Sequence, residues 1–461
     1  MRIGRNTGAT TRARFDLSAP RLLVGSFAAL IAAGTAGFLV LPGLWIGERA
    51  SFVDALFMAT SAVCVTGLSV LDVSSRMTFF GQLWLLVLIQ LGGIGIVTLA
   101  ALAAAALGRR MSLEAEEAAA GPTVVMPEGG PRALVRSVVR VTLVIEAIGA
   151  ALLWLDWRST LGNLGAIWPA VFHAVSAFCN AGFSIFRDNL VGFADDPITL
   201  GVIGMLIIAG GIGFLVFEDL QARARGLRRR VTLHTRLALI TTVVLLDGAM
   251  PLFLFFEWDH TLAGHGLGAS IANAAFMSVT PRTAGFNAVD YEQISNPSLV
   301  LTLALMWIGG SPGSTAGGVK TTTAALLALL FVARLRGRES VSFANRSVPD
   351  STVQRAVGLA VGAMLLLFAF VFALLFTEIP GDDVVRNRES FVHLVFEAQS
   401  ALGTVGLSMN KTSDLTPPGR LLIVLLMFLG RVGPLAVLEA MARRSRRKQP
   451  YRLGREDVLV G

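Results

Sequence analysis

The chain has 461 residues, of which 54% are hydrophobic and 15% charged, and its formal net charge is +8. Soluble domains carry about 25% charged residues, so this composition excludes an ordinary soluble domain and predicts a membrane protein that crosses the bilayer several times. The two cysteines, Cys64 and Cys179, give no disulfide or metal framework, and the five histidines lack ligand spacing. We therefore expect neither an enzyme nor a cofactor bound by this chain.

The chain begins with a basic tail and a long apolar stretch. Residues 1–20 are rich in arginine, and the apolar stretch 22–45 is long enough to cross a bilayer. A signal peptide has a much shorter apolar core and a small-residue cleavage site. The stretch is therefore predicted to be a first transmembrane helix that follows a cytoplasmic tail.

The same order of segments then occurs four times: a long apolar stretch, a short half-apolar segment and a second long apolar stretch. The middle segments are too short to span, as expected of re-entrant helices, which occur at membrane depth only where protein or water surrounds them. We predict an all-α polytopic membrane protein with eight transmembrane helices and four pore helices, in four repeats around one central pore. The outer helices are expected at 22–45, 133–157, 233–257 and 353–377, the pore helices at 51–63, 167–178, 267–280 and 390–401, and the inner helices at 78–107, 198–220, 297–333 and 418–441.

The distribution of charge gives the orientation of these segments. The tails and connections on one side hold 28 arginines and lysines, against nine on the side of the short loops, so both termini are expected in the cytoplasm. Topology thus accounts for the basic runs, and nucleic-acid binding is not expected because no folded basic module accompanies them. The predicted parts are a cytoplasmic basic tail at 1–20, repeat 1 at 21–108, a cytoplasmic connection with repeat 2 at 109–222, repeat 3 with an interrupted inner helix at 223–335, repeat 4 at 336–442, and a second basic tail at 443–461.

After each pore helix the sequence repeats a short run centred on a glycine. Runs 1 to 4 are Ser61–Ser69, Ser176–Ser184, Ser278–Asn287 and Ser400–Ser408, and their glycines are Gly67, Gly182, Gly285 and Gly406. Residues 404–407 of run 4 read Thr-Val-Gly-Leu, which is nearly the Thr-Val-Gly-Tyr core of a potassium-channel filter, where backbone carbonyls replace the water around the ion. Four copies in one chain would supply the four walls of one pore.

A cluster of small residues recurs 24 to 28 residues after each of these glycines, about half-way along each inner segment. The clusters begin at Gly92, Gly210, Gly309 and Gly430. They either let helices pack closely or, if they face one axis, widen the path beneath the runs. In the fourth cluster Arg431 replaces a glycine, and a guanidinium at membrane depth should face the interior. It is expected either to place a positive charge beside the path or to form a salt bridge with Glu439 or Glu397.

The third inner segment contains Pro312 and several glycines, which do not fit a continuous helix. Residues 309–323 end in lysine and threonines, as phosphate-binding loops do, but the Walker spacing is not met and no strand precedes them. We interpret this segment as a gate loop inside the membrane. The predicted gate residues are Gly310, Gly313, Gly317, Gly318, Lys320 and Arg431.

With these features the chain resembles the Ktr/Trk/HKT superfamily of potassium uptake proteins from about residue 20 to 441, and within it the KtrB type of membrane subunit. The resemblance implies that potassium, the substrate, is held by four filter segments and that glycine rather than serine at Gly67 goes with potassium selectivity. The implied filter residues are Val65, Thr66, Gly67 and Leu68, Asn180, Ala181, Gly182 and Phe183, Thr283, Ala284, Gly285 and Phe286, and Thr404, Val405, Gly406 and Leu407.

The resemblance also implies partners and a location. These are a homodimer, a cytoplasmic ring of RCK-type nucleotide-binding subunits (KtrA/TrkA-like) and the inner membrane of a bacterium, with the nucleotide on the partner subunit and sodium as a candidate activator. A competing hypothesis is a secondary transporter coupled to sodium or protons, since Glu146 and Asp247 are acids within predicted spans. Both lie on outer helices, away from the inferred axis, which favours a structural role for them.

Overall fold

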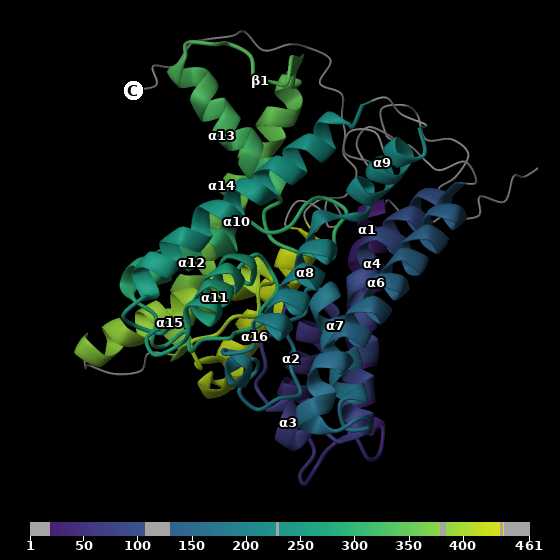
Figure 1. The fold of residues 1–461 in the computed structure, drawn as a ribbon, viewed down its shortest axis with the longest axis vertical. Helices are drawn as coiled ribbons and strands as arrows, with labels where there is room; N and C mark the ends of the chain where they lie inside the picture. Colours follow the sequence, from purple (N-terminus) through teal and green to yellow (C-terminus); the bar gives the residue numbers. More distant parts are fainter. Residues whose placement is uncertain (1–18, 107–129, 227–229, 379–383, 434–436, 438–461) are drawn as a thin grey trace, which may run out of the picture.

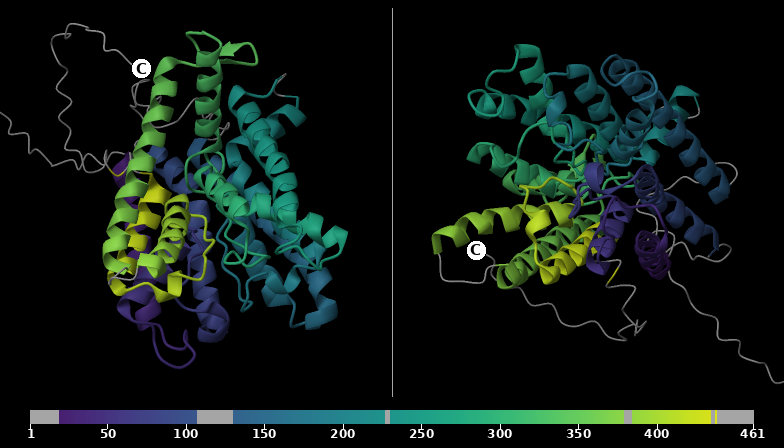
Figure 2. Two further views of the ribbon diagram at one scale, coloured as in Figure 1. Left: turned by 90° about the vertical axis from the view of Figure 1, so that its left-hand side faces the viewer. Right: turned by 90° about the horizontal axis from the view of Figure 1, so that it is seen from below.

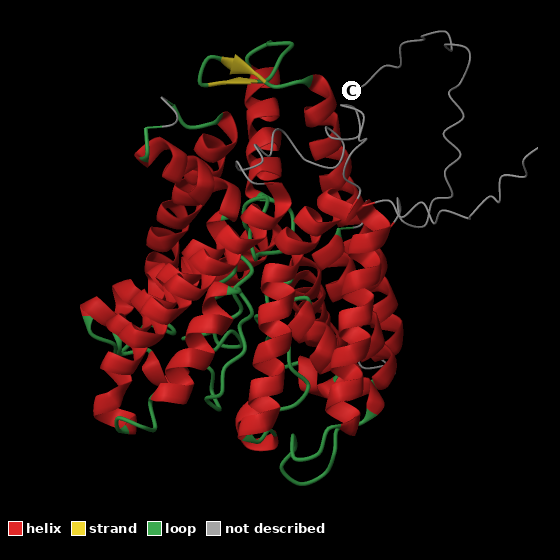
Figure 3. Ribbon diagram, turned by 90° about the vertical axis from the view of Figure 1, so that its right-hand side faces the viewer, coloured by secondary structure: helices red, strands yellow, loops and turns green. Residues whose placement is uncertain are grey.

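The computed structural model describes residues 19–106, 130–226, 230–378, 384–433 and 437, and these are almost entirely helical (Figure 3). Four long helices form the outer set, and each contains a stretch long and apolar enough to cross a membrane. Only 17% to 28% of each stretch is buried, so most of its side chains face away from the protein, as expected of helices in contact with lipid. They are α1 (Ala19–Val40), α6 (Gly130–Leu161), α10 (Leu233–Glu257) and α14 (Asp350–Glu378).

A second set consists of the short helices that precede the four runs. These are α2 (Phe52–Val63), α7 (Ile167–Phe178), α11 (Leu267–Val279) and α15 (Val384–Gly403). Each has a phenylalanine in its buried face, at most 2% exposed: Phe57, Phe172, Phe276 and Phe396. Helix α15 begins at residue 384, earlier than the predicted 390. Burial of the aromatic face anchors these helices inside the protein rather than in lipid.

The inner segments differ most from the prediction. Helix α4 (Phe79–Ala106) is continuous, but α8 (Pro197–Ile212) and α9 (Phe214–Ala224) meet at an angle of 89°. The expected single helix 198–220 is therefore wrong. Gly213 has φ +95°, a conformation that side chains rarely adopt, and the Phe214 amide donates to the Gly313 carbonyl of another repeat instead of continuing the helix.

The remaining inner segments are also broken by glycine-rich backbone. Residues 308–320 separate α12 (Asn296–Trp307) from α13 (Thr321–Leu335), and α16 (Pro417–Val432) ends before Gly433, whose φ is +88°. Helix α16 therefore ends at Val432, and of the rest of the predicted helix 418–441 the structure describes only Gly433 and Val437, the latter helical. Within the described part of the chain, four helices are long and apolar enough to span a membrane, or five if α8 and α9 count as one span; the eight transmembrane helices stay a prediction.

Short elements connect the helices. They are α3 (Val73–Arg76), the 3-10 helices η1 (Val191–Phe193) and η2 (Thr412–Asp414), and an antiparallel hairpin of β1 (Ser342–Phe343) and β2 (Arg346–Ser347). The hairpin lies beyond the ends of α13 and α14 (Figure 3), where Val341 and Val348 pack against those helices. The predicted tails, apart from residues 19 and 20, and all of residues 109–129 of the connection lie outside the described residues.

The four parts of the chain pack in a ring. Helices α1, α4 and α6 lie side by side (Figure 1), and Figure 2 shows the four quarters of the sequence around a common centre. The inner helix of each part contacts the short helix of the next: α4 with α7, α8 with α11, α12 with α15, and α16 with α2. Because α16 contacts α2, the last repeat closes the ring against the first.

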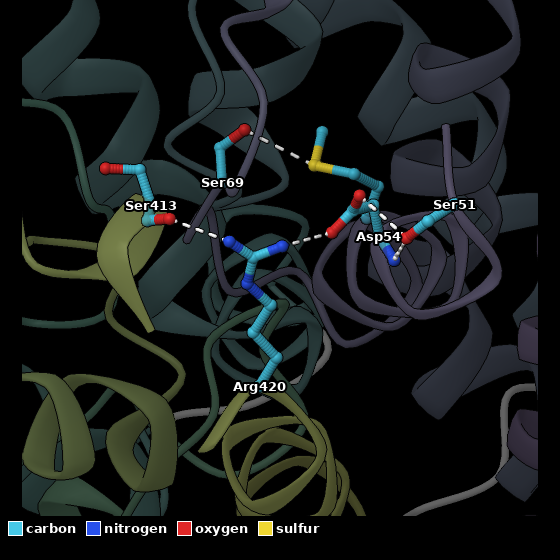
Figure 4. A network of polar contacts seen from close by, with 6 residues as sticks. Ser51, Asp54, Ser69, Ser413 and Arg420 are labelled. Carbon is cyan, nitrogen blue, oxygen red and sulfur yellow. Dashed lines mark hydrogen bonds and ion pairs between the residues drawn. The ribbon is translucent and has the colours of Figure 1, made fainter. Parts of the chain in front are cut away.

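An ion pair between repeats 4 and 1 stabilises the contact of α16 with α2 (Figure 4). Arg420 of α16 pairs with Asp54 in the first turn of α2 at 2.5 Å and donates to the Ser413 carbonyl at 2.7 Å. The Asp54 carboxylate also accepts a hydrogen bond from Ser51, the residue that caps α2. Both charged side chains are mostly buried, at 21% and 15% exposure, so the pair is shielded from much of the solvent screening that weakens surface pairs.

Replacing Arg420 or Asp54 by alanine is expected to lower the free energy of unfolding by about 1 kcal/mol, because each change breaks this link between repeats 4 and 1. The thermal unfolding midpoint of the purified protein measures it, and the double variant should lose little more than either single one. Asp195→Asn is the matched control, because it removes an ion pair with His265 in which Asp195 is 75% exposed. If Asp195→Asn lowered the free energy of unfolding as much as Arg420→Ala or Asp54→Ala, the assignment of the Arg420–Asp54 pair as a link between repeats 4 and 1 would be wrong.

Candidate functional site

The four runs share one backbone conformation. Two positions before each glycine stands a residue with φ between 49° and 67°, and each glycine has φ between 70° and 97°. The non-glycine residues are Val65, Asn180, Thr283 and Thr404. Three of them are β-branched, for which positive φ is a real outlier that costs energy. Such strain persists only where the surroundings impose it, and its fourfold repetition points to a functional constraint.

The runs form a closed ring. A Cβ placed on each glycine would come within 3.0 Å of a backbone carbonyl oxygen of the next run. The pairs are Gly67 with Ala181, Gly182 with Ala284, Gly285 with Val405, and Gly406 with Thr66. Run 1 therefore abuts run 2, run 2 abuts run 3, run 3 abuts run 4, and run 4 abuts run 1. The structure brings all of the predicted filter residues together, with carbonyl oxygens of the four runs next to one another.

A hydroxyl near the end of each short helix fastens its run. Ser61 and Ser400 accept hydrogen bonds from the Gly67 and Gly406 amides at 3.1 and 3.0 Å. Ser176 instead donates to the Phe183 carbonyl at 2.8 Å, and in run 3 Thr280 donates to the Phe286 carbonyl. Run 3 begins at Ser278 in the sequence, so by analogy with the other runs Ser278 would be expected to bear this hydroxyl. Ser278 in fact donates to Ala275 within its own helix.

The signal for Thr280 was present in the sequence. Each fastening hydroxyl stands four residues after the buried phenylalanine of its short helix, and Thr280 keeps this spacing to Phe276. Counting from the serine at the start of each run selects Ser278 instead, because run 3 is one residue longer before its glycine. The spacing of four residues from the buried phenylalanine identifies the hydroxyl in all four helices, because side chains four residues apart share a helix face.

Thr280→Ala is expected to destabilise the protein by about 1–3 kcal/mol, because it leaves the buried Phe286 carbonyl without its donor. Ser278→Ala is the matched control and should change stability by less than about 0.5 kcal/mol. The thermal unfolding midpoints of the two variants measure the difference. If the Ser278 variant lost more stability than the Thr280 variant, the assignment of Thr280 as the residue that holds run 3 would be wrong.

The predicted gate loop lies between repeats 2 and 4. Its two ends run side by side, with the Gly309 amide donating to the Val319 carbonyl at 2.8 Å. Its Ser311 and Thr315 amides donate to the carbonyls of Gly211 and Gly210, in the broken inner helix of repeat 2. The 89° bend between α8 and α9 and the gate loop therefore depend on each other.

The loop also touches the runs directly. The side chains of Thr315 and Asn180 are hydrogen bonded at 3.0 Å, and a Cβ on Gly317 would collide with the hydroxyl oxygen of Thr404. The hydroxyls of Thr283 and Thr404 are buried without hydrogen-bond partners. The loop thus packs against the first filter residues of runs 2 and 4, Asn180 and Thr404, and the ring keeps two unpaired oxygens near it.

Two basic side chains accompany the loop, Arg431 buried and Lys320 half-buried. The Lys320 ammonium folds back on its own loop and donates to the Ala316 carbonyl at 2.7 Å. Arg431 donates to the carbonyl of Thr315 in the loop and to that of Gly92 in α4, the latter at 2.9 Å. Arg431 therefore connects three repeats. The expected alternative of a salt bridge to Glu397 is wrong, and Glu439 lies outside the described residues.

A cavity of about 250 Å³ borders this arrangement. Gly318, Lys320 and Arg431 line it, together with Trp307 of α12 and Leu359 of α14. In the described part of the chain no group of three His, Cys, Asp or Glu side chains could hold a metal ion. The runs offer backbone carbonyls and the unpaired hydroxyls of Thr283 and Thr404 to a cation.

The two acids behind the transporter hypothesis differ in burial and in partners. Glu146 is 4% exposed and accepts a hydrogen bond from Gln90 of α4 at 3.0 Å, with the Cys179 thiol 3.9 Å away. It thus ties α6 to α4 and to the base of run 2. Asp247 is exposed on α10.

A ring of strained carbonyl-bearing runs, inside a bundle of apolar helices and next to a buried glycine loop, defines a membrane protein that passes cations. The sequence profile of the TrkH family, described as "Cation transport protein", matches residues 32–447. The chain therefore belongs to the TrkH family, and it is a multi-pass membrane cation transporter rather than an enzyme.

Individual relatives agree with this assignment. The chain is 36% identical to "Potassium/sodium uptake protein NtpJ" of Enterococcus hirae, over 98% of this chain and 99% of that protein. It is also 36% identical to "Ktr system potassium uptake protein B" of Bacillus subtilis, over 95% and 96% of the two chains. The crystal structure of the potassium transporter TrkH from Vibrio parahaemolyticus matches with a TM-score of 0.73 at 19% identity, over 94% of this chain and 86% of that one.

Proposed function

We propose that this chain takes up potassium ions across the cytoplasmic membrane of a bacterium through a filter formed by runs 1 to 4. The observation that carries the proposal is the closed ring, in which carbonyl oxygens of four strained runs adjoin one another. Carbonyl rings of this kind replace the hydration shell of a monovalent cation. The names of the relatives, potassium uptake proteins at 36% identity, support potassium as the ion.

In the proposed topology the chain crosses the membrane eight times and forms four re-entrant helices, with both termini in the cytoplasm. Helices α8 and α9 then form one broken crossing, and α12 and α13 another, with their non-helical backbone buried in protein. The excess of arginine and lysine on one side supports this orientation. The filter accordingly opens to the outside.

Permeation follows from the arrangement of the short helices. Each of α2, α7, α11 and α15 ends shortly before the filter residues of its run, so its negative dipole end favours a cation at the base of the ring. An ion entering from outside exchanges water for the carbonyls of the filter segments and the hydroxyls of Thr283 and Thr404. Inward flow is driven by the membrane potential, which contributes about 2.3 kcal/mol per charge per 100 mV.

The gate in this proposal consists of residues 309–323 and Arg431. The loop packs directly against runs 2 and 4, and Arg431 ties it to α4 and α16. A displacement of the loop towards the adjacent cavity would open the path. The positive charge of Arg431, with the Lys320 amine beside it, would raise a barrier to cations while the loop is in place.

Control of the gate is assigned to a separate cytoplasmic subunit, an RCK-type ring that binds a nucleotide. Two relatives are named as parts of a Ktr system, which supports a partner subunit. A homodimer in the bilayer and activation by sodium complete the proposal.

Restoration of growth tests the function directly. A bacterium that lacks its own potassium uptake systems should grow at low potassium when it makes this chain together with a regulatory subunit. Normal amounts of the chain in the membrane without growth would contradict the proposal. A flux that reverses at a potential set by sodium or proton coupling, rather than at the potassium potential, would favour a secondary transporter.

A further inference from the structure

Behind each run, the short helix carries a side chain that the proposed filter does not use. It stands one residue after the buried phenylalanine, and all four of these side chains are at most 1% exposed: Met58, His173, Met277 and Glu397. In three repeats it contacts the residue two positions after the glycine of its own run, which is Ser69, Ser184 or Ser408. That residue directly follows the last filter residue, so whatever fixes it fixes the end of the run.

The contact is strongest in repeat 4. One carboxylate oxygen of Glu397 accepts a hydrogen bond from Ser408, and the other accepts one from Thr412 at 2.7 Å. The Ser408 and Thr412 hydroxyl oxygens are 3.1 Å apart, so the three side chains form one buried network. A carboxyl group with a hydroxyl donor on each of its oxygens is held in one orientation. The end of run 4 is therefore firmly tied to α15.

Repeat 2 has a different group in the same place. The His173 Nδ1 atom lies 2.8 Å from the Pro169 carbonyl, which can only accept, so Nδ1 donates and Nε2 is left to accept from Ser184 at 2.8 Å. The imidazole stacks on Phe186 with 4.7 Å between ring centres. Its orientation is thus fixed on both sides, and it ties the end of run 2 to α7.

Repeats 1 and 3 have methionine in this position. Ser69 reaches the Met58 sulfur at 3.3 Å, but a thioether is a weak acceptor, and the same hydroxyl also donates to the Leu71 carbonyl. In repeat 3 the residue after the run's last filter position is Asn287, which donates to the Val289 carbonyl at 3.4 Å. These two runs are tied to their short helices weakly at this point.

The order of the ring gives this pattern its significance. Run 1 abuts run 2, run 2 abuts run 3, and run 4 closes the ring, so runs 2 and 4 face each other across the axis, as do runs 1 and 3. The strong polar contacts therefore lie on one diagonal and the two methionines on the other. A filter held firmly along one diagonal keeps the spacing of its carbonyls when a smaller ion would favour their contraction.

We propose that Glu397 and His173 are positioning residues of the filter, which hold the ends of runs 4 and 2 through Ser408 and Ser184 and thereby set the preference for potassium over sodium. The inference rests on the proposed function, because it presupposes that the runs conduct potassium. Neither side chain touches the ion in this assignment. Each acts through a serine hydroxyl that orients the last peptide of its run.

The test compares the ratio of potassium to sodium uptake rates among variants of the full chain at equal amounts in the membrane. Glu397→Met and His173→Met introduce the residue that repeats 1 and 3 already have there. We expect each to lower the ratio by about tenfold, because the loss of the hydrogen bond frees the last peptide of its run, and tenfold corresponds to about 1.4 kcal/mol. Ser408→Ala should lower the ratio as much as Glu397→Met, and the double variant should lower it no further.

Two further variants separate positioning from general stability. Glu397→Gln keeps an oxygen that can accept from Ser408, so its ratio should stay close to that of the unsubstituted chain. This variant also provides the test if Glu397→Met does not accumulate in the membrane. Glu378→Gln changes another hydrogen-bonded acid, which binds the amide and hydroxyl of Thr416 away from the runs, and should leave the ratio unchanged.

An unchanged ratio in Glu397→Met or Ser408→Ala, or effects that multiply in the double variant, would overturn the inference. A glutamine variant as unselective as the methionine variant would also overturn it. Failure of the unsubstituted chain to take up potassium would instead refute the proposed function, so the two failures are distinguishable.

Discussion

Replacing Gly67 with serine is expected to reduce the preference for potassium over sodium by about tenfold or more. Gly67 has φ +97°, and a Cβ there would come within 3.0 Å of the Ala181 carbonyl oxygen of run 2. Backbone strain of this kind costs about 1–3 kcal/mol, and 1.4 kcal/mol corresponds to a factor of ten. The ring must relieve the collision by separating runs 1 and 2, which changes the spacing of the carbonyls that select the ion.

Sodium and potassium uptake rates in cells lacking their own potassium uptake systems measure this effect. Gly201→Ser is the matched control, because Gly201 lies in α8 with no atom within 4 Å of an added Cβ and without a positive φ. It should leave the ratio unchanged. If Gly67→Ser had the selectivity of the unsubstituted chain, the assignment of run 1 to the filter would be wrong.

Replacing Arg431 with glutamine is expected to raise potassium uptake in the absence of the regulatory subunit by about tenfold. The guanidinium donates to the carbonyls of Thr315 and Gly92, and hydrogen bonds from a charged group contribute about 1.5–3 kcal/mol each. The variant removes one positive charge beside the path and weakens the attachment of the gate loop to α4. Both changes favour the open position of the loop.

Initial uptake rates with and without the regulatory subunit provide the measurement. Arg158→Gln serves as the control, since Arg158 stacks on Trp154 at the far end of α6 and should not affect gating. Deletion of residues 311–318 should act in the same direction as Arg431→Gln. A variant that stays closed without the regulator would show that Arg431 supports the structure and does not restrain the gate.

The sequence alone indicated the repeated parts of the site because their signals are local. A glycine that accepts positive φ, a short apolar helix and a proline among glycines each limit the backbone wherever the chain folds. Runs 1 to 4, the non-helical segment 308–320 and the interior position of Arg431 could therefore be predicted from residue types and spacing.

Tertiary structure decided which groups meet. Arg431 binds carbonyls 116 and 339 residues away, and because every residue has a carbonyl, no sequence pattern could single these out. The bend at Gly213 arises against the gate loop of another repeat, and the place of Glu397 opposite His173 depends on the order of the ring. The sequence by itself determined that there are four runs around glycines. Only the packing of each inner helix against the next short helix determined how those runs close into one ring, because that closure joins residues from opposite ends of the chain.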